Sequence, residues 1–224
     1  MTESQSTAER PAAAADDSLG GRLRAERDRR GLTLRELARR LEVSPSLVSQ
    51  IETGKTQPSV RTLYAIVSEL GVSFDDLFAP PGSAERRAAP SQPSGSEGEQ
   101  PSAAYGRVQR AGDRAVIDLG SGVRWERLTT WNDRDLEFLY AIYEAGGSSS
   151  PDGSLMRHQG REFGTVITGE LGVKVGFEDY VLGPGDSIAF DSSIPHRLHN
   201  DGGEVATAIW IVLGRYHPAQ PPDQ

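Results

Sequence analysis

The stretch TLRELARRLEVSPSLVSQIE, residues Thr33–Glu52, decides the architecture of the N-terminal part of this 224-residue chain. In its first half, apolar residues recur at the i, i+3, i+4 and i+7 spacing of one helix face: Leu34, Leu37, Ala38 and Leu41. Thr33 is a good N-terminal cap, and Glu36 completes a T-x-x-E capping box, in which two side chains satisfy main-chain amides reciprocally. The pattern therefore predicts a helix that begins after Thr33.

A second start signal follows at Ser44, which can cap a helix whose first position is Pro45, where the missing N–H costs nothing. So few residues separate the two helices that they must cross at a large angle, as in a helix-turn-helix. The outer side of the second helix carries small, uncharged hydrogen-bonding residues: Ser46, Ser49 and Gln50. Such a face can contact base edges in a major groove, although any helical hairpin has a polar outer side.

The segment RRGLTLRELA, residues 29–38, and the run that follows Ser44 closely resemble the DNA-binding domain of the xenobiotic-response-element family of lambda-repressor-like regulators. The shared pattern S-x-x-x-V-S-Q-I-E-x-G-K-x-x-P occupies residues 44–58, and the resemblance covers about residues 19–78. It implies an all-α, five-helix domain that binds double-stranded operator DNA. The family's DNA contacts fall, by matching position, on Ser44, Ser46, Ser49, Gln50, Thr53 and Lys55. The resemblance also implies a structural ion pair between Arg27 and Glu52.

The formal net charge of −8 is distributed unevenly along the chain. Residues 18–79 contain ten Lys and Arg against eight Asp and Glu, whereas residues 105–217 contain eleven against sixteen. A domain with so small a positive excess contacts few phosphates on its own, which favours a homodimer. The chain has no cysteine, which excludes disulfides and thiolate metal sites, and no apolar run long enough to span a membrane. We therefore expect a cytoplasmic protein without a membrane partner.

Composition divides the chain into five parts. Residues 1–17 and 218–224 are expected to be tails, and the first of them is polar, without periodicity and predicted to be disordered. Residues 18–79 form the predicted helix-turn-helix domain. Residues 80–104 lack Leu, Ile, Val and aromatic residues and are predicted to be a flexible linker, so the two domains need not be rigidly docked. Residues 105–217 form the predicted second domain.

In the second domain the hydrophobic period changes from that of a helix to that of a strand. Short alternating or apolar runs occur at residues 123–128, 136–143, 163–167, 171–177, 187–190 and 205–213. Between them lie Gly, Pro, Asp and Ser, which predicts an all-β antiparallel sandwich or barrel.

Two stretches, RHQGREFGTVITGEL at residues 157–171 and LGPGDSIAFDSSIPHRLHN at residues 182–200, resemble the two motifs of the cupin jelly-roll barrel. The positions that match are His158, Glu162 and Gly169 in the first motif and Gly185, Asp186, Pro195, His196 and Asn200 in the second. The first histidine of the family's H-x-H is replaced by Met156. The resemblance implies a sensor pocket for a small-molecule effector, in which Met156 and Asn200 are candidate lining residues.

Because strand side chains alternate, His158 and Glu162 can face one interior, and His196 reaches it from a later strand. Two imidazoles and one carboxylate form a candidate site for one divalent ion such as Fe, Zn, Mn or Ni. The alternative is a metal-free pocket in which the same three side chains hydrogen-bond one another. Arg157 and Arg161 alternate with the presumed ligands and should face outward or the domain interface.

The domain order resembles that of bacterial one-component regulators that are not enzymes, in which the helix-turn-helix reads DNA and the cupin binds an effector and dimerises. A mononuclear non-haem iron enzyme, hydroxypropylphosphonate epoxidase, resembles this chain in the same domain order and ligand triad, and it is the alternative. In an enzyme of this kind, we expect the Ser and Gln residues of the recognition helix and the G-K-x-x-P turn to be replaced by other residues. Both are intact here, which favours the regulator.

Overall fold

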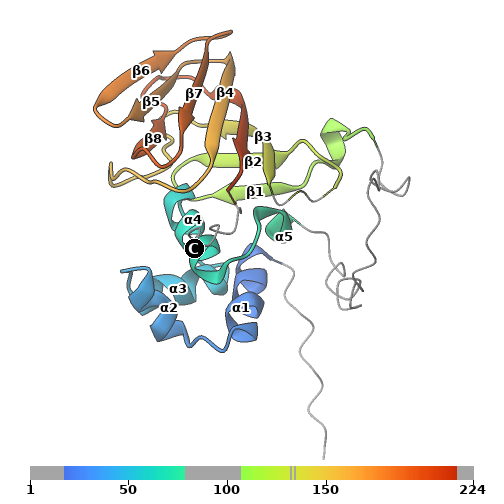
Figure 1. The fold of residues 1–224 in the computed structure, drawn as a ribbon, viewed down its shortest axis with the longest axis vertical. Coiled ribbons are helices and arrows are strands. Elements are labelled where there is room, and N and C mark those ends of the chain that lie inside the picture. The colour runs from blue at the N-terminus through green and yellow to red at the C-terminus, as the bar shows by residue number, and fades with distance from the viewer. Residues whose placement is uncertain (1–17, 79–106, 132, 134, 216–224) are drawn as a thin grey trace, which may run out of the picture.

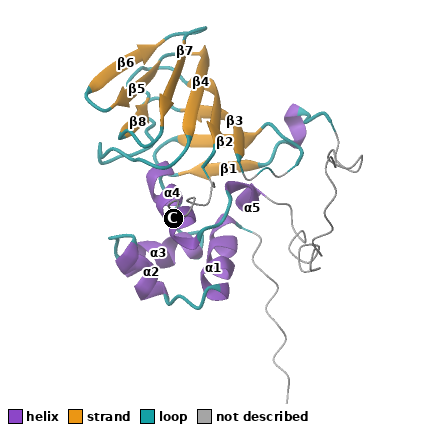
Figure 2. Cartoon of the chain, in the orientation of Figure 1, coloured by secondary structure: helices purple, strands orange, loops and turns teal. Residues whose placement is uncertain are grey.

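The structure is a computed structural model that describes residues 18–78, 107–131, 133 and 135–215. The tails predicted at residues 1–17 and 218–224 and the linker predicted at residues 80–104 lie outside the described residues. Figure 1 shows the helices gathered at one end of the molecule and the strands at the other. The same view coloured by secondary structure makes the division between the two parts clear (Figure 2). In the described part of the chain, no helix is long and apolar enough to cross a membrane.

The helical part contains α1 (Leu19–Arg29), α2 (Leu34–Arg40), α3 (Pro45–Glu52), α4 (Val60–Leu70) and α5 (Phe74–Phe78). Each of the four longer helices begins where a hydroxyl accepts a hydrogen bond from the main-chain N–H three residues later, at 3.1 Å in every case; the caps are Ser18, Thr33, Ser44 and Ser59. The expected five-helix domain is confirmed only in part, because α5 is a single turn of five residues.

Two side-chain contacts expected in the helical part have different outcomes. The Arg27 guanidinium lies against the Glu52 carboxylate, with N–O distances of 2.6 and 2.9 Å, and both side chains are buried. This ion pair was expected from the family resemblance. The capping box is half formed, because Thr33 accepts from the Glu36 amide but the Glu36 carboxylate pairs with Arg40 at 2.9 Å. An ion pair one turn along the same helix therefore takes the place of the reciprocal cap.

The β part contains a six-stranded sheet in the order β1-β2-β3-β9-β4-β7 and a three-stranded sheet in the order β6-β5-β8, with antiparallel pairing throughout. A short 3-10 helix at Ala111–Asp113 precedes the first strand. The strands are β1 (Val116–Leu119), β2 (Val123–Arg127), β3 (Leu136–Tyr143), β4 (Arg161–Thr168), β5 (Leu171–Val175), β6 (Glu178–Leu182), β7 (Ser187–Asp191), β8 (His196–His199) and β9 (Ala206–Leu213). Among the described strands, no ladder joins the two sheets into one. The expected closed barrel is therefore corrected to a pair of open sheets.

The inner face of the larger sheet follows the alternation of its strands. In β3 and β9 every second residue is buried, and the cross-strand pair Leu139 and Trp210 belongs to that inner set. The alternate residues, on the outer face of the sheet, are only partly buried. Among them, Phe138, Ile211 and Phe163 form an apolar row across three adjacent strands. The alternation of side chains therefore places Glu162 and Trp210 on the inner side of this sheet.

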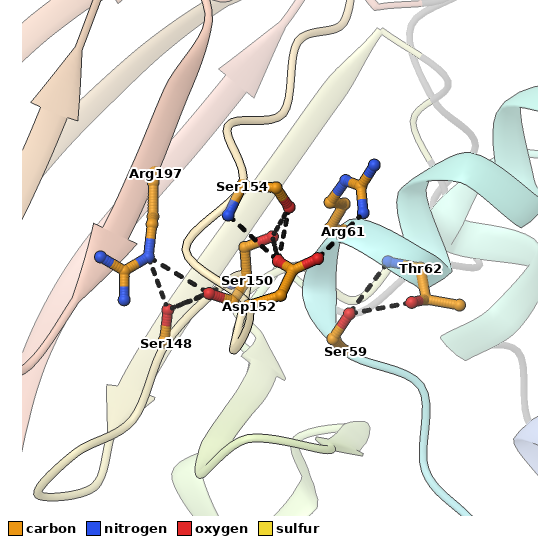
Figure 3. Close-up of polar contacts among 8 residues, drawn as sticks. All are labelled: Ser59, Arg61, Thr62, Ser148, Ser150, Asp152, Ser154 and Arg197. Carbon is orange, nitrogen blue, oxygen red and sulfur yellow. Dashed lines mark hydrogen bonds and ion pairs between the residues drawn. The ribbon is translucent and has the colours of Figure 1, made fainter. Parts of the chain in front are cut away.

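The helical part docks on the β part through α4 and the loop before it. The Gly120 amide donates to the Pro58 carbonyl at 2.8 Å, and the Arg61 amide donates to the Ser149 carbonyl at 3.0 Å. Figure 3 shows the Arg61 side chain pointing toward Asp152, whose carboxylate lies 3.6 Å away. The domains are thus in direct contact, although the linker composition had suggested that they need not dock rigidly.

A serine-rich loop supplies the β side of this contact. Ser148 and Ser150 bind each other and the Arg197 side chain on β8, at 2.9 to 3.2 Å (Figure 3). Asp152 accepts from the Ser154 hydroxyl at 2.5 Å and from the Ser154 amide at 3.1 Å, and these hydrogen bonds lower the pKa of its carboxyl. The loop therefore presents an ionised carboxylate and a main-chain carbonyl to the N-terminal end of α4, where both are favourable.

Candidate DNA-binding face and metal centre

The predicted DNA-contacting residues lie together on and just after α3. Five of them are exposed and one is half-buried: Ser44, Ser46, Gln50, Thr53 and Lys55 are exposed, and Ser49 is half-buried. Two of the hydroxyls already have local roles, since Ser44 caps α3 and Thr53 donates to the Ser49 carbonyl at 2.8 Å. Figure 1 shows α3 on the part of the helical domain away from the strands. This face is therefore open to a DNA duplex.

The three candidate metal ligands meet inside the β part. Glu162 lies on β4, His196 begins β8, and His158 lies in the segment that leads into β4. One Glu162 oxygen, Oε1, is 2.9 Å from His158 Nε2 and 3.1 Å from His196 Nε2. The three ligand atoms lie within 4.8 Å of one another, so this group can hold a metal ion.

The donor set fits a cation for a second reason, which is the orientation of the imidazoles. His158 Nδ1 lies 2.9 Å from the Gln159 carbonyl, and His196 Nδ1 lies 2.8 Å from the Ile194 carbonyl. A carbonyl only accepts, so each Nδ1 carries a proton, and in the neutral ring Nε2 presents a lone pair to Glu162. The buried atoms His158 Nε2 and Glu162 Oε1 also lack a hydrogen bond of good geometry. Two facing acceptors need either a proton or a cation between them.

Electrostatics keep the Glu162 carboxyl ionised. Burial opposes ionisation, but the neighbouring imidazoles of His158 and His196 outweigh it and hold the pKa of Glu162 well below its usual value. For His196, burial lowers the pKa, yet the contact with Glu162 outweighs that effect and raises it overall. The group therefore carries an anionic carboxylate in a buried site, which a divalent cation would neutralise.

Trp210 orients the carboxylate from the neighbouring strand. Its indole Nε1 donates to Glu162 Oε2 at 2.7 Å, which turns the other oxygen, Oε1, toward the two imidazoles. The indole ring lies directly on Gly164, where an added Cβ would fall 1.9 Å from a ring carbon. Only a glycine at position 164 leaves room for the indole that hydrogen-bonds to Glu162. Hydrogen bonds of this kind, to a metal-binding side chain from a residue that does not itself bind the metal, commonly fix the orientation of the ligand in metal sites.

The cavity at this group is small, about 20 Å³, which is room for an ion or a water molecule. Met156, the position that replaces the family's first histidine, is buried and lines it. Asn200 is also buried but does not line it. Its side-chain amide donates to the carbonyls of Tyr143 and Glu204, at 2.9 and 2.7 Å, so it ties the backbone together.

A residue of the helical part closes this cavity. The Tyr64 ring, on α4, stacks on the His158 imidazole with a centroid distance of 4.7 Å and an interplanar angle of 11°. Its hydroxyl donates to Glu137 at 3.0 Å, and the Arg215 guanidinium lies 3.7 Å from the ring centroid. Arg215 also pairs with Glu137 at 3.1 Å. Sequence reasoning missed Tyr64, because no local pattern connects a helix residue with a pocket so far along the chain.

Comparisons with known proteins agree with the two parts of the structure. The helix-turn-helix family matches residues 23–77, and the cupin domain family matches residues 139–212. The chain is 27% identical over 192 residues to the HTH-type transcriptional regulator PuuR of Escherichia coli (strain K12), which covers 85% of this chain and 91% of PuuR.

Two solved structures extend the comparison. A crystal structure of an HTH_3 family transcriptional regulator from Vibrio cholerae has a TM-score of 0.59 and 22% identity, covering 90% of this chain and 97% of that one. It supports the fold. The structure of hydroxypropylphosphonic acid epoxidase from S. wedmorenis is 21% identical, with a TM-score of only 0.42, covering 90% of this chain and 100% of that one.

Proposed function

The chain is a helix-turn-helix protein with a cupin domain, and we propose that it regulates transcription by binding operator DNA as a homodimer whose affinity responds to a small-molecule effector. The observation that carries the proposal is the exposure of Ser46 and Gln50 on α3 and of Lys55 just after it. Gln pairs well with an adenine edge, and Lys with a phosphate. Such a role would place the protein in the cytoplasm, with the DNA.

In this proposal Ser44, Ser46, Ser49, Gln50, Thr53 and Lys55 form the DNA-binding set. We place the boundary of the DNA-binding domain at residues 18–79 and that of the cupin at residues 105–217. The direct docking of α4 on the cupin supports a regulator, because a change in the cupin can reach the helix-turn-helix without passing through the linker.

We also propose that His158, Glu162 and His196 hold one divalent ion. The set of two imidazoles and one carboxylate suits Fe(II), Mn(II), Ni(II) or Zn(II). When bound, the ion would act as a structural or sensory group, and we propose no catalysis. The outward direction of the α3 hydrogen-bonding groups supports this choice over the epoxidase alternative, since an enzyme has no use for an exposed DNA-reading face.

The homodimer is supported by the outer face of the six-stranded sheet. Phe163 on β4 is 38% exposed, and it lies beside Ile211 of β9, which in turn pairs with Phe138 of β3. Apolar side chains at adjacent positions of a sheet are typical of a protein interface. Two copies would place two α3 helices on a pseudo-palindrome, with half-site centres about 34 Å apart.

Footprinting with the purified full-length protein on its own promoter tests the function. We expect two protected half-sites separated by about one helical turn. Protection that is equal on unrelated DNA at the same salt concentration would reject sequence-specific regulation, since salt sets the strength of non-specific binding.

A further inference from the structure

A second, much larger cavity lies between the two domains. It has a volume of about 880 Å³, within the range of sites for small organic molecules. Its walls come from α2 and α4 on one side and from the segment before β4 on the other. The residues that line it include Arg40, Glu42, Arg61, Tyr64, Arg157 and Arg215.

This cleft and the small cavity at the candidate metal centre share a wall. Tyr64, Met156 and His158 line both. The inner cavity, at about 20 Å³, is too small for an organic molecule while the Tyr64 ring covers His158. In this conformation, a small organic molecule therefore has room in the cleft and not in the cupin interior.

The charges around the cleft favour an anion. Four arginines line it against two glutamates, Glu42 and Glu69. Two of the arginines are engaged, since Arg40 pairs with Glu69 at 2.7 Å and Arg215 pairs with Glu137 at 3.1 Å.

The other two arginines are available to a ligand. Arg61 is half exposed and lies 3.6 Å from Asp152, a loose pair that is worth little in water. Arg157 is exposed, and the described residues include no ion-pair partner for it. A guanidinium in this state is a good partner for a carboxylate or a phosphate. Leu41, Ala65 and Leu155 add apolar surface to the same cleft.

We propose that the cleft between α2, α4 and the segment 155–159 binds a small organic anion through Arg61 and Arg157. The ligand carries a carboxylate or phosphate group for the arginines and a short apolar body for the remaining wall. Its identification as the regulatory effector rests on the proposed function, whereas the site itself does not.

The position of the cleft explains how such a ligand would act on DNA binding. Arg40, Leu41 and Glu42 line it, and they form the end of α2 and the turn into α3. Glu42 has a left-handed backbone with φ of 56°, two residues before the α3 cap Ser44. A ligand that binds one conformation of this turn more tightly than another shifts the population toward the conformation that it prefers. The affinity for DNA changes with that population if the two conformations bind DNA differently.

Calorimetric titration of the full-length protein with glutarate and with inorganic phosphate tests the site, at constant ionic strength. We expect at least one of them to saturate, and Arg157→Ala to bind it roughly tenfold more weakly. Arg61→Ala should weaken binding in the same way. The matched control is Arg161→Ala, an exposed arginine on β4 that does not line the cleft, and it should bind like the parent. A diamine of the same length as glutarate should not saturate.

Saturation by neither anion would overturn the proposal, as would equal loss of binding in the Arg157→Ala and Arg161→Ala proteins. A gel-shift titration on the same preparations, with and without the anion that binds, separates this proposal from the proposed function. Anion binding without specific DNA binding keeps the site and rejects the regulator. Specific DNA binding without anion binding keeps the regulator and rejects the site.

Discussion

The aromatic ring of Tyr64, in the helical domain, lies parallel to the imidazole of His158, in the cupin, with centroids 4.7 Å apart. Tyr64 is 7% exposed, so its ring is buried between the domains. One side chain of α4 therefore touches both the candidate metal centre and the cleft beside it.

Removal of the Tyr64 ring should destabilise the protein by about 3–5 kcal/mol, as expected for truncating a buried aromatic residue to alanine. The matched variant Tyr64→Phe keeps the ring and loses only the hydroxyl that donates to Glu137, so it should cost about 1 kcal/mol. Urea unfolding followed by circular dichroism measures both. Equal midpoints for the parent and Tyr64→Ala would show that this docking contact does not form in solution.

Glu162→Gln should lower the metal content, because it removes the anionic ligand and leaves the dication poorly neutralised. We expect the fold to survive, since apolar burial between the sheets supplies most of the stability. The measurement is elemental analysis after dialysis against a divalent metal. The control is Glu178→Gln, an exposed carboxylate on β6. A parent that takes up no more metal than the Glu162→Gln variant would contradict the assignment.

The metal-free protein should be most stable between about pH 4.5 and pH 6.5, the ordinary pKa values of Glu162 and His196. The pKa of His196 is raised, so its contribution is complete below 6.5 and is lost as the pH rises through the folded value. The pKa of Glu162 is lowered, so its contribution is present above 4.5 and is lost as the pH falls toward the folded value.

Thermal unfolding of the chelator-treated protein across this pH range measures the effect. In the Glu162→Gln variant the melting temperature should depend less on pH, both below pH 4.5 and above pH 6.5. The substitution removes the carboxyl whose pKa is lowered, and it also removes the partner that raises the pKa of His196. A bound metal should oppose the loss at high pH, since it needs neutral imidazoles. A melting temperature of the metal-free parent that rises steadily above pH 6.5 would contradict the assigned direction.

Gln50→Ala should weaken operator binding by about 1–3 kcal/mol and relax the base preference at one position of each half-site. The reason is the exposed position of Gln50 on α3. A gel-shift series with operator variants measures both effects. Gln57→Ala, an exposed glutamine beyond the helix, is the control and should bind like the parent. Unchanged affinity and preference for the Gln50 variant would remove this residue from the base-contacting set.

Phe163→Asp should weaken the dimer, because it puts a charge into the apolar row on the outer face of the six-stranded sheet. Sedimentation at several protein concentrations should then show more monomer than in the parent. DNA affinity should fall with it, since one domain with a small positive excess contacts few phosphates. Tyr180→Asp, an equally exposed aromatic position on β6, should leave the mass unchanged. A parent that is already monomeric would reject this interface.

The local part of the structure could be predicted well from the sequence. Thr33 and Ser44 are strong start signals whose hydrogen bonds stay within four residues, so the starts of α2 and α3 were predicted where they occur. The run 136–143 was predicted in full as well, because one face of β3 is buried and its residues alternate. The strand β6 was missed, since four of its five residues are exposed and leave no such signal.

The candidate site could be predicted only as far as its residues belong to sequence motifs. His158, Glu162 and His196 were found through their motifs, and the structure brings them together. The contacts of Tyr64 and Trp210 with this group depend on docking and on the close approach at Gly164, which no periodicity encodes. Asn200 matches the same motif, yet its side chain faces main-chain carbonyls instead of the cavity.

Two of the bonds that join the domains, Gly120 to Pro58 and Arg61 to Ser149, connect main-chain atoms only. Substitution of the charged side chains around these two bonds can therefore change the ligand that the cleft accepts while the main-chain bonds remain. One position is an exception. A Cβ at Gly120 would fall 2.8 Å from the Gln57 carbonyl oxygen, so a substitution at that glycine, unlike one at the charged residues nearby, would force the main chains of the two domains apart.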